Sequence, residues 1–252
     1  MSAGNADPGR EHGADRFYRS WATGQGLCEF RVSVAETDLQ IFAQHPLGPE
    51  AEAAVRRVRR DIEMYAASHD GFIEGLLPLT AEPGAPDVVR RMCEAGAAYA
   101  VGPMAAVAGA VAEHVGRELL RRSGQVIVEN GGDVFFQTSE PPTFGLYAGK
   151  ASPFTGRVRF TPRGTACGGV CTSSGTVGHS LSFGRADAVV ALASDTALAD
   201  AAATAIGNIL HTPDDVPRAL DLEKERGLLD GLLVAIGGTL AAWGALEIVE
   251  GG

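Results

Sequence analysis

The chain has 252 residues, of which 45% are hydrophobic and 21% are charged, a composition typical of a globular protein with a substantial core. Its formal net charge of -10 argues against nucleic acid as the main partner, because binding a phosphate backbone needs clustered basic residues, although a local pocket can still hold a nucleotide. The polar N-terminal stretch lacks the apolar core of a secretory signal, so we expect a cytoplasmic protein whose cysteines are reduced.

The first half of the sequence predicts a hairpin followed by helices. Residues 1–15 are polar, so we expect them to be disordered and residues 16–252 to form a single domain. Residues 28–33 and 38–43 run or alternate in apolar and β-branched side chains, which predicts two paired strands. Apolar residues at helical spacing then predict three helices, at residues 49–68, 87–99 and 104–122.

The second half mixes strands, a loop and helices. Short apolar runs predict strands at residues 126–128, 134–138, 145–148, 156–160 and 188–193. Residues 164–178 are rich in small side chains and are expected to be a loop, whereas residues 196–210 and part of 214–226 are expected to be helical. We therefore expect an α+β fold in which antiparallel sheets pack against helices.

The long apolar stretch at residues 227–246 requires a separate interpretation. It contains Asp230 and a central pair of glycines, Gly237 and Gly238. A hairpin that folds at these glycines fits better than a membrane span, so no membrane partner is expected.

The most informative stretch is VENGGDV, at residues 128–134. Two adjacent glycines, Gly131 and Gly132, allow positive φ angles or a close approach of backbone amides to a ligand. The polar residues Glu129, Asn130 and Asp133 flank them, and a plain turn does not need all three. The stretch therefore predicts a turn that recognises a bound ligand.

Gly102, Pro103 and Met104 open the third predicted helix. The unpaired amides and partial positive charge of a helix N-terminus suit a phosphate group. Proline in a first helical turn is also ordinary punctuation, and from the residues alone this second interpretation is the better one.

A further candidate segment is the small-residue stretch at residues 164–184. Thr172, Ser173, Ser174 and Gly175 supply hydroxyls and flexible amides, which favour an anion-binding nest over a plain connector. His179 adds a side chain that titrates near neutral pH.

Four cysteines occur in the chain. Cys167 and Cys171 have only His179 close by, whereas structural zinc requires four Cys or His ligands, so we expect small buried side chains there. A persulfide carrier is the functional alternative. Cys28 and Cys93 lie in apolar surroundings and are expected in the core.

Asp200 and Thr204 are spaced so that a carboxylate and a hydroxyl lie on one face of a helix. Such a pair suits Mg²⁺, which usually takes one or two protein carboxylates together with phosphates and water. The alternative is an exposed aspartate beside a threonine that bonds to its own backbone. The flanking alanines allow another element to approach this face closely.

Five motifs in this order resemble the UPF0280 family, a branch of the ApbE-like superfamily. The resemblance runs from about Tyr18 to Gly237. It is carried by ETDL at 36–39, VGPMAAVAGAVAE at 101–113, VENGGDV at 128–134, GVCTSSGTVGHSLSFGRADA at 169–188 and ALADAAATAIGN at 197–208. Five long motifs are far more specific than one pair of glycines.

The resemblance implies a fold and an activity. ApbE proteins proper are flavin transferases, which bind FAD and move its FMN half onto a threonine of a target protein with the help of Mg²⁺. Their fold is α+β and related to the T-fold architecture. The family's turn against the flavin nucleotide corresponds here to Asn130, Gly131, Gly132 and Asp133.

The same resemblance assigns other positions. It makes Asp200 and Thr204 the metal ligands and matches the family's TSG segment to residues 172–175. The segment that supplies a backbone carbonyl to the metal falls near residues 102–110.

The sequence departs from the transferase pattern at two places. The HIIDPxTG motif is not present, and only His179 is retained from it, so the aspartate that helps to activate the acceptor threonine is missing. The lysine of the GIAKGY segment is replaced by Ala or Val. The metal and nucleotide parts are kept, whereas much of the activating part is lost.

The leading hypothesis is a cytoplasmic ApbE-like protein that binds a flavin- or pterin-like nucleotide, such as FAD or FMN, with Mg²⁺. It would be a transferase-type enzyme of cofactor or one-carbon metabolism, with His179 as its catalytic group. Glu129 and Asp133 would accept hydrogen bonds from ring or ribose groups. The alternatives are a sulfur-handling accessory protein that uses Cys167 or Cys171, and a non-catalytic scaffold. The small-residue helix and the final hairpin are compatible with a homo-oligomer.

Overall fold

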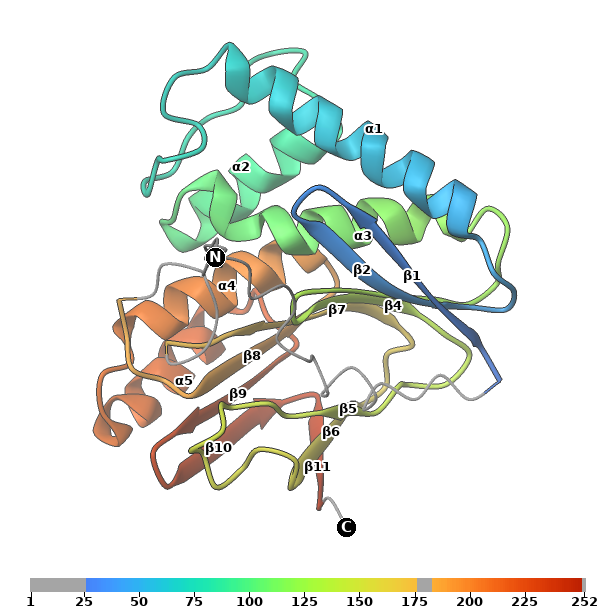
Figure 1. Cartoon of the computed structure of the whole chain (residues 1–252). Coiled ribbons are helices and arrows are strands. Elements are labelled where there is room, and N and C mark those ends of the chain that lie inside the picture. The colour runs from blue at the N-terminus through green and yellow to red at the C-terminus, as the bar shows by residue number, and fades with distance from the viewer. Residues whose placement is uncertain (1–25, 176–182, 251–252) are drawn as a thin grey trace, which may run out of the picture.

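The computed structural model describes residues 26–175 and 183–250 and arranges them in three layers (Figure 1). The central layer is an eight-stranded antiparallel sheet. In spatial order its strands are β1 (Cys28–Val34), β2 (Thr37–Ala43), β3 (Val126–Asn130), β4 (Asp133–Gln137), β7 (Cys167–Ser173), β8 (Ala188–Ala193), β9 (Gly231–Ile236) and β10 (Thr239–Gly244).

Helices cover one face of this sheet, and a second, three-stranded sheet covers part of the other (Figure 1). The helices are α1 (Gly48–Ala67), α2 (Asp87–Tyr99), α3 (Val107–Leu119), α4 (Thr196–Ile209) and α5 (Val216–Arg226). The small sheet has the order β11 (Leu246–Glu250), β6 (Val158–Pro162) and β5 (Phe144–Gly145). The result is a single α+β domain of antiparallel sheets and helices, as the sequence predicts.

The central strands are buried on both faces, which gives two separate apolar cores. In β8, Val189 and Ala191 belong to the core shared with the helices, whereas Val190 and Leu192 belong to the core shared with the small sheet. Side chains alternate between the two faces of a strand, so an uninterrupted apolar run is what a doubly covered strand requires. This explains why residues 188–193 show no polar alternation.

Most predicted elements are confirmed within two or three residues. The first hairpin is β1 and β2, the helices at 49–68 and 87–99 are α1 and α2, and the apolar C-terminal stretch is the hairpin of β9 and β10, which turns at Gly237 and Gly238. The third helix differs, because a 3₁₀ turn at Pro103–Ala106 precedes α3. The expected disorder of residues 1–15 lies outside the described residues.

The loop predicted at residues 164–178 is wrong, because β7 occupies Cys167–Ser173 inside the large sheet. Its glycines are required by close packing. A Cβ on Gly169 would lie 2.5 Å from the Cα of Thr196 at the start of α4, and a Cβ on Gly168 would lie 2.8 Å from the carbonyl oxygen of Ala193. Small residues that usually indicate a loop here allow a helix to lie against the strand.

Two predicted strands need correction, and one strand was missed. The strand expected at 145–148 is limited to Phe144–Gly145, although Leu146 and Ala148 are buried against the small sheet. The strand expected at 156–160 begins later, at Val158, because Gly156 has a positive φ of 73° in the preceding turn. Strand β11 was not predicted.

The helices of the described ranges are short or interrupted by polar residues. No single helix there is long and apolar enough to span a bilayer. Helix α2 and the segment Pro103–Leu119 satisfy the length and composition criteria only as a pair, bent by 104°.

Replacing Gly169 by alanine is expected to destabilise the fold by about 1–3 kcal/mol, the range found for forcing an extra carbon into a packed core. The matched control is Gly48→Ala, because a Cβ on Gly48 meets nothing within 4 Å and its φ is not positive. Urea unfolding of both variants measures the difference. Equal midpoints for the two variants would contradict the packing argument.

Candidate functional site

The turn between β3 and β4 is a two-residue hairpin loop. Asn130 pairs with Asp133, and the loop residues Gly131 and Gly132 have φ angles of 71° and 111°. Positive φ at both central residues is what a two-residue hairpin turn matched to the twist of its strands requires, and glycine adopts it without strain. The N–H of Gly132 donates to Oε1 of Glu129 at 2.9 Å, which fixes the turn.

The first turn of α3 connects this hairpin to α4. The side-chain nitrogen of Asn130 donates to the carbonyl of Ala108 at 3.0 Å, and the N–H of Gly109 donates to Oδ2 of Asp200 at 2.9 Å. A Cβ on Gly109 would overlap the carbonyl of Thr196, so α3 and α4 can lie this close only because residue 109 is glycine. The carboxylate of Asp200 therefore sits on the partial positive charge of a helix N-terminus.

Asp133 and Asp200 form a buried acidic pair. Burial, and then the charge of Asp200, raise the pKa of Asp133 well above its usual range. Burial raises the pKa of Asp200 to about 7, although the amides of Gly109 and Ala108 oppose this shift. Asp133 is 8% exposed, and its Oδ1 has no hydrogen-bond partner among the residues that the structure describes. A proton or a cation is needed here to offset the charge.

Helix α4 is held in place by a buried carboxylate that the sequence analysis missed. Oε2 of Glu113, which is 2% exposed, accepts the N–H of Thr196 at 2.8 Å. Its Oε1 accepts from Arg91 at 2.8 Å and from Arg117 at 2.7 Å. The available signal was a glutamate four residues before an arginine, in a helix whose first two turns are rich in small side chains.

The start of α4 is also capped. Asp195 accepts the N–H of Leu198 at 2.9 Å and pairs with Arg91 at 2.6 Å. Because Asp200 lies on the second turn of this helix, the cap and Glu113 together determine where its carboxylate lies relative to α3.

The hydroxyl-bearing residues Thr172, Ser173 and Thr204 lie at the end of β7 and on α4, two elements that pack against each other. Thr172 lies at the end of β7, where its carbonyl oxygen would be 3.7 Å from a Cβ on Gly132. Oγ of Ser173 would be 3.5 Å from a Cβ on Gly207 of α4. The side chains of Thr172 and Ser173 are half-buried. Thr204 is half-buried one helical turn after Asp200.

The remaining predicted site residues fall in different places. The N–H of Gly175 donates to the carbonyl of Ala186 at 2.9 Å, which closes the strands β7 and β8, and Ser174 lies just before it. His179 lies outside the described residues.

Gly102, Pro103 and Met104 do not open the helix as predicted. Gly102 is buried, and a Cβ there would overlap the carbonyl of Gly75. The amides at the start of α3 belong to Ala108 and Gly109, and they bind the carboxylate of Asp200.

The strand order brings several of these segments to one end of the large sheet. Asn130 pairs with Leu39 near the start of β2, Ser173 pairs with Val189, and Ala188 pairs with Ala235 just before the β9–β10 turn. The glycine turn, the end of β7 and the Gly237–Gly238 turn therefore share that end. A cleft of about 830 Å³, lined by Lys150, Asp187 and the Gly237–Gly238 turn, opens there.

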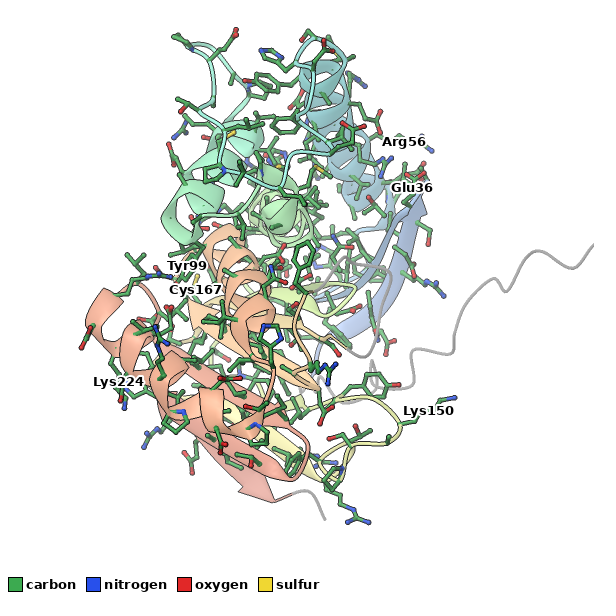
Figure 2. The ribbon with its side chains drawn as sticks, turned by 90° about the vertical axis from the view of Figure 1, so that its left-hand side faces the viewer. Glu36, Arg56, Tyr99, Lys150, Cys167 and Lys224 are labelled. Carbon is green, nitrogen blue, oxygen red and sulfur yellow. The ribbon has the colours of Figure 1, made fainter. Side chains whose placement is uncertain are left out.

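Figure 2 shows on which side of the molecule residues near the two ends of the large sheet lie. Glu36, in the β1–β2 turn, and Lys150 lie on one side of the molecule, and Cys167, at the start of β7, lies on the other.

The cysteines are not arranged for thiolate chemistry. Cys171 is buried, and burial raises its pKa well above the ordinary value; its thiol donates to the carbonyl of Thr196 at 3.3 Å. Cys167 is exposed, so the expectation that it is buried is wrong, and desolvation still raises its pKa. Cys93 is buried as expected, whereas Cys28 is exposed because it begins the edge strand β1.

The oxygen ligands at this site suit a hard divalent cation. Asp133 and Asp200 supply carboxylates and Thr204 supplies a hydroxyl, and the buried Oδ1 of Asp133 lacks a donor in the described chain. No cluster of three or more His, Cys, Asp or Glu side chains suited to a metal occurs in residues 26–175 and 183–250. Mg²⁺ commonly completes its shell with phosphates and water, so two carboxylates are compatible with it.

The fold and the site define a class of protein. The three layers match those of solved flavin transferases, although the sequences are distant. The flavin transferase ApbE from Vibrio cholerae aligns with a TM-score of 0.57 and 10% identity over 88% of this chain and 97% of that one. The apo flavinyl transferase ApbE from Pseudomonas stutzeri aligns with a TM-score of 0.54 and 13% identity over 88% and 94%. These likenesses show the fold.

The sequence comparisons then identify the family. A UPF0280 protein from Methanocella arvoryzae is 40% identical over 219 residues, which are 86% of this chain and 88% of that protein. A UPF0280 protein from Methanopyrus kandleri is 43% identical over 203 residues, 79% and 82% of the two chains. The family model described as AbpE bacteria matches residues 19–241. The chain belongs to the UPF0280 family of ApbE-like proteins.

The acidic pair predicts an unusual pH dependence in metal-free protein. From pH 5 to 7 the folded state retains a proton on Asp200, whose pKa is about 7, and the pKa of Asp133 is raised in the same direction, whereas the unfolded carboxyls, with an ordinary pKa of 3.8, have lost their protons. The free energy of unfolding should therefore fall as the pH rises, with Asp200 contributing roughly 1 kcal/mol per pH unit. Asp133→Asn should reduce the slope, and the exposed Asp214→Asn should keep it. Chelator-treated protein unfolded in urea provides the measurement, and equal slopes would count against the pair.

Thiol mapping tests the burial of the cysteines. Iodoacetamide at neutral pH should modify the exposed Cys28 and Cys167 in native protein and leave Cys93 and Cys171 unmodified until urea is added. Mass spectrometry locates the label. Native modification of Cys171 as fast as that of Cys28 would be inconsistent with its environment.

Proposed function

We propose that the protein binds a flavin-type nucleotide at this end of the sheet, together with a divalent cation. The observation that carries the proposal is the acidic pair: Asp133, whose buried Oδ1 has no hydrogen-bond partner within the described ranges, interacts with the buried carboxylate of Asp200 beside the first turn of α3. Such a pair is stable only when a proton or a cation is shared. The family membership makes a nucleotide the expected source of phosphate ligands for that cation.

Asp200 and Thr204, the metal ligands that the resemblance implies, would hold Mg²⁺ together with Asp133, whose pKa is raised by the charge of Asp200. The cation would neutralise phosphate charge and polarise a phosphoryl oxygen. The amides of Gly131 and Gly132 would approach the nucleotide, and the hydroxyls of Thr172, Ser173 and Ser174 would donate to it.

The polar side chains of the turn would recognise the ligand. Asn130 is already held by Ala108, which orients the turn, while Glu129 and Asp133 would accept hydrogen bonds from ring or ribose groups. His179 remains the proposed group for proton transfer. A pterin-like ring is the alternative ligand with similar hydrogen-bonding edges.

We propose a nucleotidyl-type transfer in cofactor or one-carbon metabolism as the reaction class. A cytoplasmic location, assembly as a homo-oligomer and a relation to the T-fold architecture are further proposals that rest on the sequence and the family. The sulfur-carrier alternative is opposed by the raised pKa of both Cys167 and Cys171, because the reactive form of cysteine is the thiolate. The alternative of a non-catalytic scaffold differs from the proposal because it predicts that no flavin, pterin or metal binds.

Thermal unfolding in the presence of FAD and MgCl₂ tests the proposal. At about 100 times the dissociation constant a ligand stabilises a protein by roughly 2.7 kcal/mol. For a chain of this length that should raise the melting temperature by about 5–10 °C. Asp200→Asn should lose the part of the shift that depends on magnesium, and Asp214→Asn should retain it. The absence of any shift with FAD, FMN or a pterin, with or without metal, would refute the proposed function.

A further inference from the structure

The cleft of about 830 Å³ has a chemically mixed lining. The segment at residues 147–153 contributes Tyr147 and Lys150. Asp187, just before β8, and the Gly237–Gly238 turn also line the cleft. The volume lies within the range of small-ligand sites. None of these residues belongs to the acidic pair or the glycine turn at Asn130–Asp133.

Lys150 is presented by a braced turn. The N–H of Ser152 donates to the carbonyl of Gly149 at 3.3 Å, and Oγ1 of Thr155 donates to that carbonyl at 2.6 Å. The N–H of Ala148 donates to Oγ1 of Thr155 at 3.0 Å. The backbone that carries Lys150 is therefore fixed, and only its side chain must be ordered when a ligand binds, which lowers the entropic cost of binding.

Lysine is rare in this chain, and the two lysines differ in their environment. Lys224 pairs with Asp221 at 2.9 Å on α5. Lys150 is exposed at the cleft, and within the described ranges it has no ion pair. Figure 2 shows Lys150 and Lys224 on opposite sides of the molecule. A cation that lines a cleft and has no ion pair with the described part of the chain is available to an anionic ligand.

Asp187 supplies a second polar group of opposite charge to the lining of the cleft. Its Oδ2 accepts the N–H of Gly237 at 2.9 Å, which fixes the carboxylate against the turn. No ion pair joins Asp187 to Lys150 among the described side chains, so the two opposite charges face one cleft separately. The neighbouring glycines carry no side chains that would fill the space. A fixed carboxylate of this kind can accept hydrogen bonds from ribose hydroxyls, as in dinucleotide-binding folds.

We propose that this cleft binds a nucleoside phosphate, with Lys150 pairing with the phosphate and Asp187 accepting hydrogen bonds from the ribose. The half-buried ring of Tyr147 provides an apolar surface in the same lining. The proposal goes beyond the proposed function, because it requires neither a flavin nor the metal. The nucleoside phosphate can be one half of a dinucleotide or a separate ligand, and both have the same chemistry.

Calorimetric titration with AMP tests the assignment on the full chain. Lys150→Met should weaken AMP binding about tenfold or more, since it removes a charge-assisted contact. Lys150→Arg should retain most of the affinity. Lys224→Met is the matched control and should bind AMP like the wild type. Asp187→Asn should weaken binding of AMP but not of its 2′,3′-dideoxy analogue.

Chemical acetylation provides an independent measurement, because the chain contains only two lysines. AMP should protect Lys150 and leave the labelling of Lys224 unchanged. FAD that displaces AMP would identify the nucleotide as half of a dinucleotide, and simultaneous binding would identify a separate ligand. Wild-type affinity in Lys150→Met, unprotected Lys150, or no binding of AMP would overturn the proposal.

The two proposals fail separately. If FAD raises the melting temperature while Lys150→Met binds AMP normally, the cleft assignment falls and the proposed function stands. If AMP binding depends on Lys150 but no flavin or pterin binds, the proposed function falls and the nucleotide cleft stands.

Discussion

The site depends on the close approach of α3, α4 and β7. Side chains at Gly109 and Gly169 would collide with Thr196 at the start of α4, so both positions must be glycine for the three elements to meet. Because of this contact, the carboxylate of Asp200 accepts the N–H of Gly109. It also interacts with Asp133, which lies on β4, the strand next to β7. Glu113 fixes the same junction from the other side by accepting the N–H of Thr196. The position of the acidic pair is therefore a consequence of packing between small residues.

Hydrogen bonds stabilise the ionised carboxylates of Asp133 and Asp200 unequally. This difference indicates where a bound cation would act. Asp200 receives backbone amides at a helix N-terminus, which stabilise its ionised form. Asp133 has one buried oxygen without a donor in the described residues, and it lies beside the charge of Asp200. Burial of an uncompensated carboxylate is costly, and a fold retains it where a ligand completes the group. A hard cation bound with a phosphate would satisfy both carboxylates together.

Local patterns in the sequence predicted most of the fold, and they failed where packing overrode them. The turn at Gly131–Gly132 and the final hairpin were predictable because their conformations are set by neighbouring residues. Strand β7 was not, because glycines that indicate a loop serve close contact with α4. The roles of the candidate residues stay predictions, and their grouping in one site was implied by the family resemblance and not by local patterns. Asp133 and Asp200 are distant in sequence, and only the strand order and the α3–α4 contact bring them together.

The negative charge around the glycine turn affects which ligands can bind there. The protein is acidic overall, and Glu129, Asp133 and Asp200 gather at the glycine turn, which repels a phosphate-bearing ligand. Where these carboxyls are ionised, a cation that arrives with an anionic nucleotide would offset this repulsion, as the proposed function requires. Lys150, further along the same sheet end, offers a positive charge that needs no metal. Binding at the turn should then depend on magnesium, whereas binding at the cleft should not.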